Sequence, residues 1–202
     1  MEHLHEIART IALTMGVGWA SGINLYASIL VLGLLGATGN MVLPENLMIL
    51  TEPIVIGAAG LMYAVEFFAD KVPGVDTGWD GLHTFIRIPA GALLAAGAVG
   101  EVDPPLALAA ALVGGSLATA THATKAGSRV MINASPEPVS NWIASLGEDL
   151  AVIGGLWVAL NYPLVFLGLL LLSVLLMIWL LPRLWAAIKK VFGFFGRLFK
   201  TT

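Results

Sequence analysis

The amino-acid sequence predicts an all-α membrane protein, a polytopic bundle of about six transmembrane helices. Hydrophobic residues make up 58% of the 202 residues and charged residues only 11%, which is too little charge to cover a soluble domain of this length. Long runs of Leu, Ala, Val, Ile and Gly recur along the chain, and such runs are typical of helices that cross a bilayer. The absence of cysteine excludes a disulfide framework, a thiolate metal site and a cysteine nucleophile.

The first three predicted spans are separated by proline, glycine and acidic residues. The first apolar segment, residues 7–37, is longer than the roughly 20 residues that a span needs. Ser21-Gly22-Ile23-Asn24 in its middle predicts a kink or a close helix contact. The second segment, residues 53–70, is stopped by Val72-Pro73-Gly74, because proline cannot continue the helical hydrogen-bond ladder. The third segment, residues 82–100, is followed by a short acidic link.

The last three predicted spans differ in composition. The fourth segment, residues 106–133, is rich in Gly, Ala, Ser and Thr; small residues let helices pack closely in lipid, so we place it at the centre of the bundle. After the break at Ser135-Pro136-Glu137-Pro138, a short amphipathic piece leads into a fifth segment that ends near Leu160. The sixth segment, residues 164–181, is almost wholly Leu, Val and Phe, and Pro182 is expected to end it.

The chain after Pro182 mixes basic and aromatic residues. Such a pattern predicts an amphipathic helix that lies in the plane of the lipid headgroups. We therefore divide the chain into a transmembrane bundle, residues 1–182, and a basic cytoplasmic tail, residues 183–202. Six spans divided at Pro104-Pro105 would also allow a three-plus-three inverted repeat, a common arrangement in transporters.

Basic residues predict the orientation, because cytoplasmic segments of membrane proteins are enriched in Lys and Arg. Six spans with a cytoplasmic N-terminus put every basic residue on or toward one side, whereas the opposite connections carry only acidic residues. We expect a multi-pass protein of the bacterial inner membrane with both termini in the cytoplasm. We expect no cleavable signal peptide, because Glu2 and Glu6 stand where a basic region would be. The basic residues are Arg9, Lys71, Arg87, Lys125, Arg129 and those of the tail.

An acidic cluster stands at the junction of the second and third segments. Glu66 and Asp70 are four residues apart and share a helix face, and Asp76, Asp80 and His83 follow within a glycine-containing turn. Ion pairing, including with Arg87, and helix capping by Asp80 are one interpretation. The alternatives are a proton-linked site or a divalent-metal site formed by Asp76, Asp80 and His83.

A basic stripe lies on the fourth segment. His122, Lys125 and Arg129 are spaced i, i+3 and i+7, so they share one helix face, and such a stripe can bind a phosphate, a carboxylate or a lipid headgroup. We include Asn24 and Asn133 in this predicted ligand site. The structural alternative is that Lys125 and Arg129 pair with carboxylates, since unpaired charges inside a bundle are too costly. The candidate carboxylates are Glu66, Asp70, Glu148 and Asp149.

Several stretches carry a resemblance to a known family. They are Ser21-Gly22-Ile23-Asn24-Leu25-Tyr26, Glu66-Phe67-Phe68-Ala69-Asp70-Lys71-Val72-Pro73, His83-Thr84-Phe85-Ile86-Arg87, and His122, Lys125 and Arg129 with Ser135-Pro136-Glu137-Pro138. In these stretches the chain resembles an uncharacterised bacterial family of integral membrane proteins, the domain of unknown function 4126. The resemblance covers most of the chain apart from the tail. It implies a multi-span membrane protein, and it supplies no established activity and no catalytic residues.

These observations lead to a hypothesis and two alternatives. The hypothesis is a transporter or flippase-like protein that binds a small anion or a phosphorylated lipid through the basic stripe, with Glu66, Asp70 and His83 as proton or counter-ion partners. The first alternative is a metal-dependent membrane enzyme that uses Asp70 and the predicted metal site, although no motif of a known enzyme class is present. The second is a structural or assembly partner.

The expected partners follow from the composition. They are the lipid bilayer and a small anion or lipid phosphate; nucleic acid is not expected. No cofactor is expected other than a divalent cation at the predicted metal site. The sequence also allows a homodimer, because the Gly- and Ala-rich faces are suited to helix contacts between copies.

Overall fold

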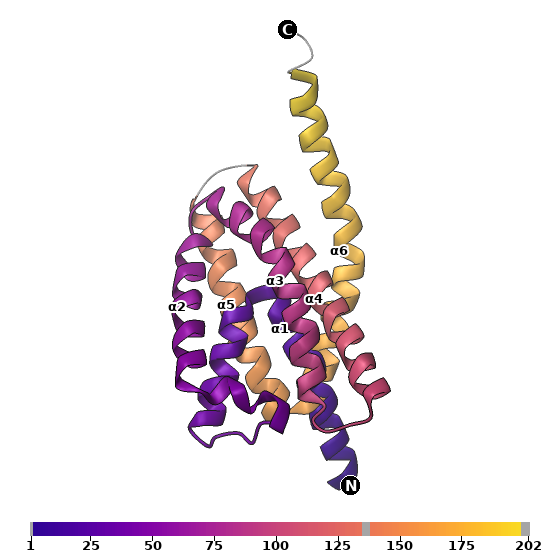
Figure 1. Ribbon diagram of the computed structural model, residues 1–202. Coiled ribbons are helices and arrows are strands. Elements are labelled where there is room, and N and C mark those ends of the chain that lie inside the picture. Colours follow the sequence, from indigo (N-terminus) through magenta and orange to yellow (C-terminus); the bar gives the residue numbers. More distant parts are fainter. Residues whose placement is uncertain (1, 135–137, 199–202) are drawn as a thin grey trace.

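The computed structural model describes residues 2–134 and 138–198, and within these ranges the chain is helical with no strand (Figure 1). A short 3-10 helix, η1, follows the first long helix, and the other helices form the bundle. The elements are α1 (Glu2–Ala37), η1 (Glu45–Thr51), α2 (Pro53–Ala69), α3 (Val75–Ala98), α4 (Pro104–Asn133), α5 (Pro138–Asn161) and α6 (Pro163–Leu198).

Four of the described helices, α1, α4, α5 and α6, are long and apolar enough to cross a membrane. The pair η1 and α2, bent by 68°, gives up to five candidate spans. The predicted six spans are therefore not confirmed. Helix α3 falls short because of its polar residues, but Asp76, Asp80 and Arg87 are fully buried within the bundle, where neighbouring helices rather than lipid surround them.

Helix α1 is not one continuous crossing. It is broken at Asn24, whose φ of −146° and ψ of 98° are not helical. Before the break, α1 runs in the same direction as α4, since Gly18 faces Gly114 and Gly22 faces Ala118.

After the break, α1 runs against α2, because Leu30 faces Gly60 and the later Gly33 faces the earlier Ile56. Helices α2 and α4 both run opposite to α3 (Figure 1). The second arm of α1 therefore returns toward the end of the bundle from which the first arm came. The predicted kink is present, and it is a reversal.

The side chain of Asn24 stabilises the reversal. Its Oδ1 accepts a hydrogen bond from the amide of Ala27 at 2.9 Å, which caps the second arm, and asparagine is among the residues best suited to this position. Its Nδ2 donates to Asp149 Oδ1 at 3.0 Å, and its carbonyl accepts from Ser28 Oγ at 2.8 Å. One residue thus starts the second arm and fixes it to α5.

We expect Asn24→Ala to lower the free energy of unfolding by about 1–2 kcal/mol, because the cap and the buried bond to Asp149 are both lost. Chemical unfolding of the purified protein in detergent measures the change. The control is Asn161→Ala, because the Asn161 side chain is exposed and donates to the carbonyl of Trp157 in its own helix. Equal stability of the two variants would contradict the role of Asn24.

The reversal changes the predicted topology. Helix α1 begins at one end of the bundle and α6 finishes beyond the other end (Figure 1), so the prediction that both termini lie in the cytoplasm is not confirmed. The first apolar segment enters and leaves the bundle at the same end, whereas α2 to α6 each run along its length. Arg9 consequently lies toward the opposite end from Lys71. The inverted repeat is not confirmed either, because α4 is continuous where α1 is broken.

Two further predictions meet different outcomes. Helix α4 packs most extensively on α3 and α1, but α1 packs against all the other helices, so the central place predicted for α4 is not confirmed. Helix α6 continues through Pro182 to Leu198, so the expected helix end at Pro182 is wrong. One lost hydrogen bond costs less than ending a helix whose turns on both sides remain bonded. The interfacial placement predicted for the tail falls largely on side chains outside the described part.

Candidate functional site

A network of charged side chains lies inside the bundle beside the break in α1. Six carboxylates and four cations take part, so the network carries a formal charge of −2 when all of them are ionised. Nine of the ten residues are buried, and the Glu148 side chain is 19% exposed. The members are Glu66, Asp70, Asp76, Asp80, Glu148 and Asp149 with Lys71, Arg87, Lys125 and Arg129.

Arg87 joins α3 to α2 and α4. Its Nη2 lies 2.6 Å from Glu66 Oε1, and its Nη1 lies 2.8 Å from Asp80 Oδ1. The same Nη1 approaches His122 Nδ1 at 3.2 Å, and His122 Nε2 is 2.7 Å from Thr84 Oγ1. His122 is therefore occupied by neighbours on α3.

Lys125 stands at the centre of the network. Its Nζ lies 2.7 Å from Asp70 Oδ2, 3.3 Å from Glu148 Oε2 and 3.4 Å from Glu66 Oε1. It also donates to the carbonyl of Ile23 at 3.1 Å, just before the break at which α1 leaves backbone groups without helical partners. Lys125 thus connects α4 to α1, α2 and α5.

Arg129 forms the second contact between the predicted basic stripe and carboxylates. Its Nη2 lies 2.7 Å from Glu148 Oε2, and its Nη1 donates to the carbonyls of Asp70 at 3.0 Å and of Asn141 at 3.2 Å. Glu148 Oε2 therefore bridges Arg129 and Lys125. The ion pairing that the sequence predicted for the stripe is present, and its ligand binding stays a prediction.

The three predicted metal ligands have separate neighbours. Asp76 Oδ1 accepts from Asn133 Nδ2 at 2.7 Å, Asp80 Oδ1 from Arg87, and His83 Nε2 lies 3.0 Å from the hydroxyl of Tyr26. In the described ranges, no group of three or more His, Asp or Glu side chains is placed so that it could hold a metal ion. Asn133 consequently belongs to the Asp76 end of the network.

Several buried carboxylate oxygens have no hydrogen-bond partner. Native proteins satisfy most buried polar atoms, so oxygens of this kind indicate protons, water or a ligand. Each belongs to a carboxylate whose other oxygen is the paired one. Within the described residues they are Glu66 Oε2, Asp70 Oδ1, Asp76 Oδ2, Asp80 Oδ2 and Asp149 Oδ2.

Lys71 lies in the turn after α2 and closes the network at that end. Its Nζ donates to the carbonyl of Phe67 at 3.0 Å and to Ser145 Oγ at 3.2 Å, and it stands 3.0 Å above the centre of the Phe67 ring. Burial lowers the pKa of Lys71 below its ordinary value, against the attraction of Asp149 and Asp70.

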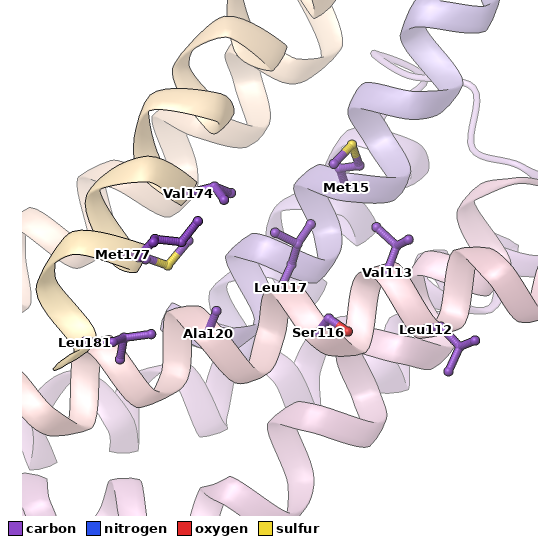
Figure 2. A pocket seen from close by; sticks show the side chains of 10 residues that line it. Met15, Leu112, Val113, Ser116, Leu117, Ala120, Val174, Met177 and Leu181 are labelled. Atoms are coloured by element: carbon purple, nitrogen blue, oxygen red, sulfur yellow. The ribbon is translucent and has the colours of Figure 1, made fainter. Parts of the chain in front are cut away.

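Two open hollows flank α6. One, of about 470 Å³, lies between α1, α4 and α6 and is lined almost entirely by apolar side chains such as Met15, Leu117 and Met177 (Figure 2). The other, of about 390 Å³, lies further along α4 and reaches Lys125 and Glu148. Only the second hollow therefore contacts the charged network.

Sequence reasoning assigned no site role to Tyr26, Lys71 or Asn141, although Lys71 belongs to the network, Asn141 accepts a hydrogen bond from Arg129 and Tyr26 contacts His83. A signal for Asn141 was available, because Asn141, Ser145 and Glu148 are spaced so that they share one face of a helix. No comparable signal exists for Tyr26, whose contact with His83 depends on the reversal of α1.

Comparison with known proteins gives one match. The model of a family described as Domain of unknown function (DUF4126) matches residues 11–183. All ten charged residues of the network lie within the matched range. No curated protein and no solved structure matches the chain.

Proposed function

The chain belongs to the DUF4126 family, a domain of unknown function, and we propose that it is a membrane transporter in which the buried network moves protons together with an anionic substrate. The observation that carries this proposal is the excess of carboxylates. Four cations face six carboxylates inside an apolar bundle, and in the described part of the chain five carboxylate oxygens of the network have no hydrogen-bond partner.

A purely structural set of ion pairs accounts less well for the network. Charged groups inside a membrane protein are expensive and usually mark a functional site. An excess of buried negative charge is more costly still unless protons or cations neutralise it. The network has two more carboxylates than cations. This excess favours the interpretation that some of the carboxylates take up and release protons.

The geometry restricts how the substrate proposed from the sequence, a small anion or a phosphorylated lipid, could bind. Lys125 and Arg129 already hold carboxylates. An anion gains access to them only when a carboxylate leaves, and protonation is the simplest way to release one. Proton uptake and anion binding would then occur together.

We place the end of the bundle that carries Lys71 in the cytoplasm, in a bacterial inner membrane. The exposed Arg183, Lys189 and Lys190 of α6 lie toward the same end, since Leu184 and Ile188 face Gly127 of α4, whereas the connections at the other end carry Glu45 and the acidic link before α4. This distribution agrees with the enrichment of basic residues in cytoplasmic segments.

Proton movement in reconstituted vesicles tests the proposal. Vesicles that contain the protein and an internal pH dye are exposed to external inorganic phosphate, glycerol phosphate or short-chain phosphatidic acid. We expect the interior to become more acidic with at least one probe. We also expect Glu66→Gln to reduce the signal to that of empty vesicles, because the variant removes a proton site and keeps the shape of the side chain.

The control is Glu45→Gln, which removes a carboxylate outside the network and should leave the signal unchanged. An unchanged internal pH with every probe, for a folded wild-type protein, would contradict the proposal and leave the structural role as the better interpretation. Bound divalent metal in the purified protein that is lost in Asp76→Ala would instead favour the metal-dependent enzyme.

A further inference from the structure

A hollow of about 390 Å³ opens at the side of the bundle and ends at the charged network. Its walls come from α1, α4, α5 and α6. The wall that α6 forms is mainly apolar, with Leu176, Met177 and Leu180 beside Ser173, whereas α4 contributes Thr121, Thr124 and Ser128. The hollow thus changes from apolar to polar between its two walls.

Lys125 and Glu148 are the charged residues that line the hollow. Glu148 differs from its partners in exposure, because 19% of its side chain is exposed, against 2% for Lys125 and none for Arg129. Its Oε2 lies 2.7 Å from Arg129 Nη2 and 3.3 Å from Lys125 Nζ. The position of this oxygen is therefore an anion position between two cations, occupied by the most accessible carboxylate of the network.

We propose that the hollow admits from the bilayer a lipid with a phosphate monoester headgroup, and that the phosphate takes the place of the Glu148 carboxylate between Arg129 and Lys125. This inference deepens the proposed function and rests on it for the coupling to protons, while the binding itself is independent of transport.

The chemistry of the hollow favours this class of ligand. Arg and Lys bind phosphate oxygens through charge-assisted hydrogen bonds, and Ser128 on the same helix brings a hydroxyl to the lining. An apolar wall open to the side of the bundle accommodates an acyl chain, which a soluble anion lacks. A volume of about 390 Å³ lies within the usual range of small-molecule sites.

The exchange balances in charge. Glu148 leaves the two cations after it has taken up one proton, and a phosphate monoester carrying one negative charge enters. The network then keeps its net charge, because one carboxylate charge is replaced by one phosphate charge. No other group has to be ionised or neutralised, so binding of the lipid is linked to uptake of one proton.

Binding of short-chain phosphatidic acid to the purified protein in detergent tests the inference. Gly147 lines the hollow and has open space at its Cβ position, and Gly154, two helical turns further along α5, has open space too but lies outside the lining. We expect Gly147→Trp to weaken binding at least about tenfold, since a bulky side chain fills the hollow, and Gly154→Trp to leave binding unchanged.

Glu148→Gln gives a second, independent readout. The neutral amide holds Arg129 and Lys125 less strongly than a carboxylate, so phosphatidic acid should bind at least about tenfold more tightly.

Three outcomes would overturn the inference: equal binding to the two tryptophan variants, preferred binding of the cationic amphiphile dodecylamine, or inorganic phosphate competing as strongly as phosphatidic acid. The last outcome would point to a soluble source of the phosphate. Lipid binding that Gly147→Trp blocks, without proton movement in vesicles, would support the binding site and contradict the proposed transport. Phosphate-driven proton movement that Gly147→Trp leaves intact, without lipid binding, would do the reverse.

Discussion

Arg87→Met is expected to lower the free energy of unfolding by about 3–5 kcal/mol, the range for removing one partner of a buried ion pair. Arg87 is fully buried and holds Glu66 at 2.6 Å and Asp80 at 2.8 Å. Methionine fills similar space but leaves both carboxylates without their closest cation in a network that already has an excess of negative charge. Chemical unfolding in detergent measures the loss.

The matched control for this experiment is Arg183→Met. Arg183 is exposed on α6, donates to the carbonyl of Trp179 and lies over the Trp179 ring, so its loss should change stability by less than about 1 kcal/mol. Combining Arg87→Met with Glu66→Gln and Asp80→Asn should recover part of the loss, because the variants are coupled. A triple variant as unstable as the sum of its parts would contradict the pairing.

Gly22→Ala is expected to be the most damaging single methyl addition in the first arm of α1, with a loss of about 1–3 kcal/mol or more. A Cβ at Gly22 would collide with the carbonyl oxygen of Ala118 and with Thr121 Oγ1. The carbonyl belongs to the backbone of α4, so α1 and α4 would have to separate. Thermal unfolding of the variant measures the effect.

Gly154→Ala should act in the opposite direction. Gly154 is also in a helix, but nothing lies within 4 Å of its Cβ position. Alanine there should stabilise the protein by about 0.4–1 kcal/mol, chiefly by restricting the unfolded chain. Opposite changes in stability for Gly22→Ala and Gly154→Ala would separate the effect of close packing from that of helix propensity. Changes of the same sign would contradict the packing of α1 on α4.

Much of the helical architecture is predictable from the sequence, because apolar runs and proline-rich breaks are local properties. The close packing of α4 on α1 and α3 follows from its small residues, and the contact of the acidic cluster with the basic stripe follows from the cost of unpaired charge. The direction of the second arm of α1 is not predictable in this way. Hydropathy reports only that a segment is buried in lipid or protein, and it is the same whether the segment crosses or turns back.

The residues of the site were more predictable from the sequence than the balance of their positive and negative charges. His122, Lys125 and Arg129 share a helix face from their spacing alone, but whether their charges are free depends on which carboxylates the fold brings near. Glu148 reaches Arg129 from another helix, and the excess of carboxylates becomes visible only when the contributions of α2, α3 and α5 meet. Long-range packing, which no local pattern encodes, decides that sum.

The reversal at Asn24 also bears on how the protein is made. During synthesis the first apolar segment reaches the membrane before the helices that cover its second arm. Its first arm enters the bundle, and its second arm returns toward the same end. The hairpin can therefore reach its final place only after α2 and α4 have been inserted beside it. Reporter domains fused to the two ends of the chain should accordingly report opposite compartments, which makes the completed insertion directly visible in cells.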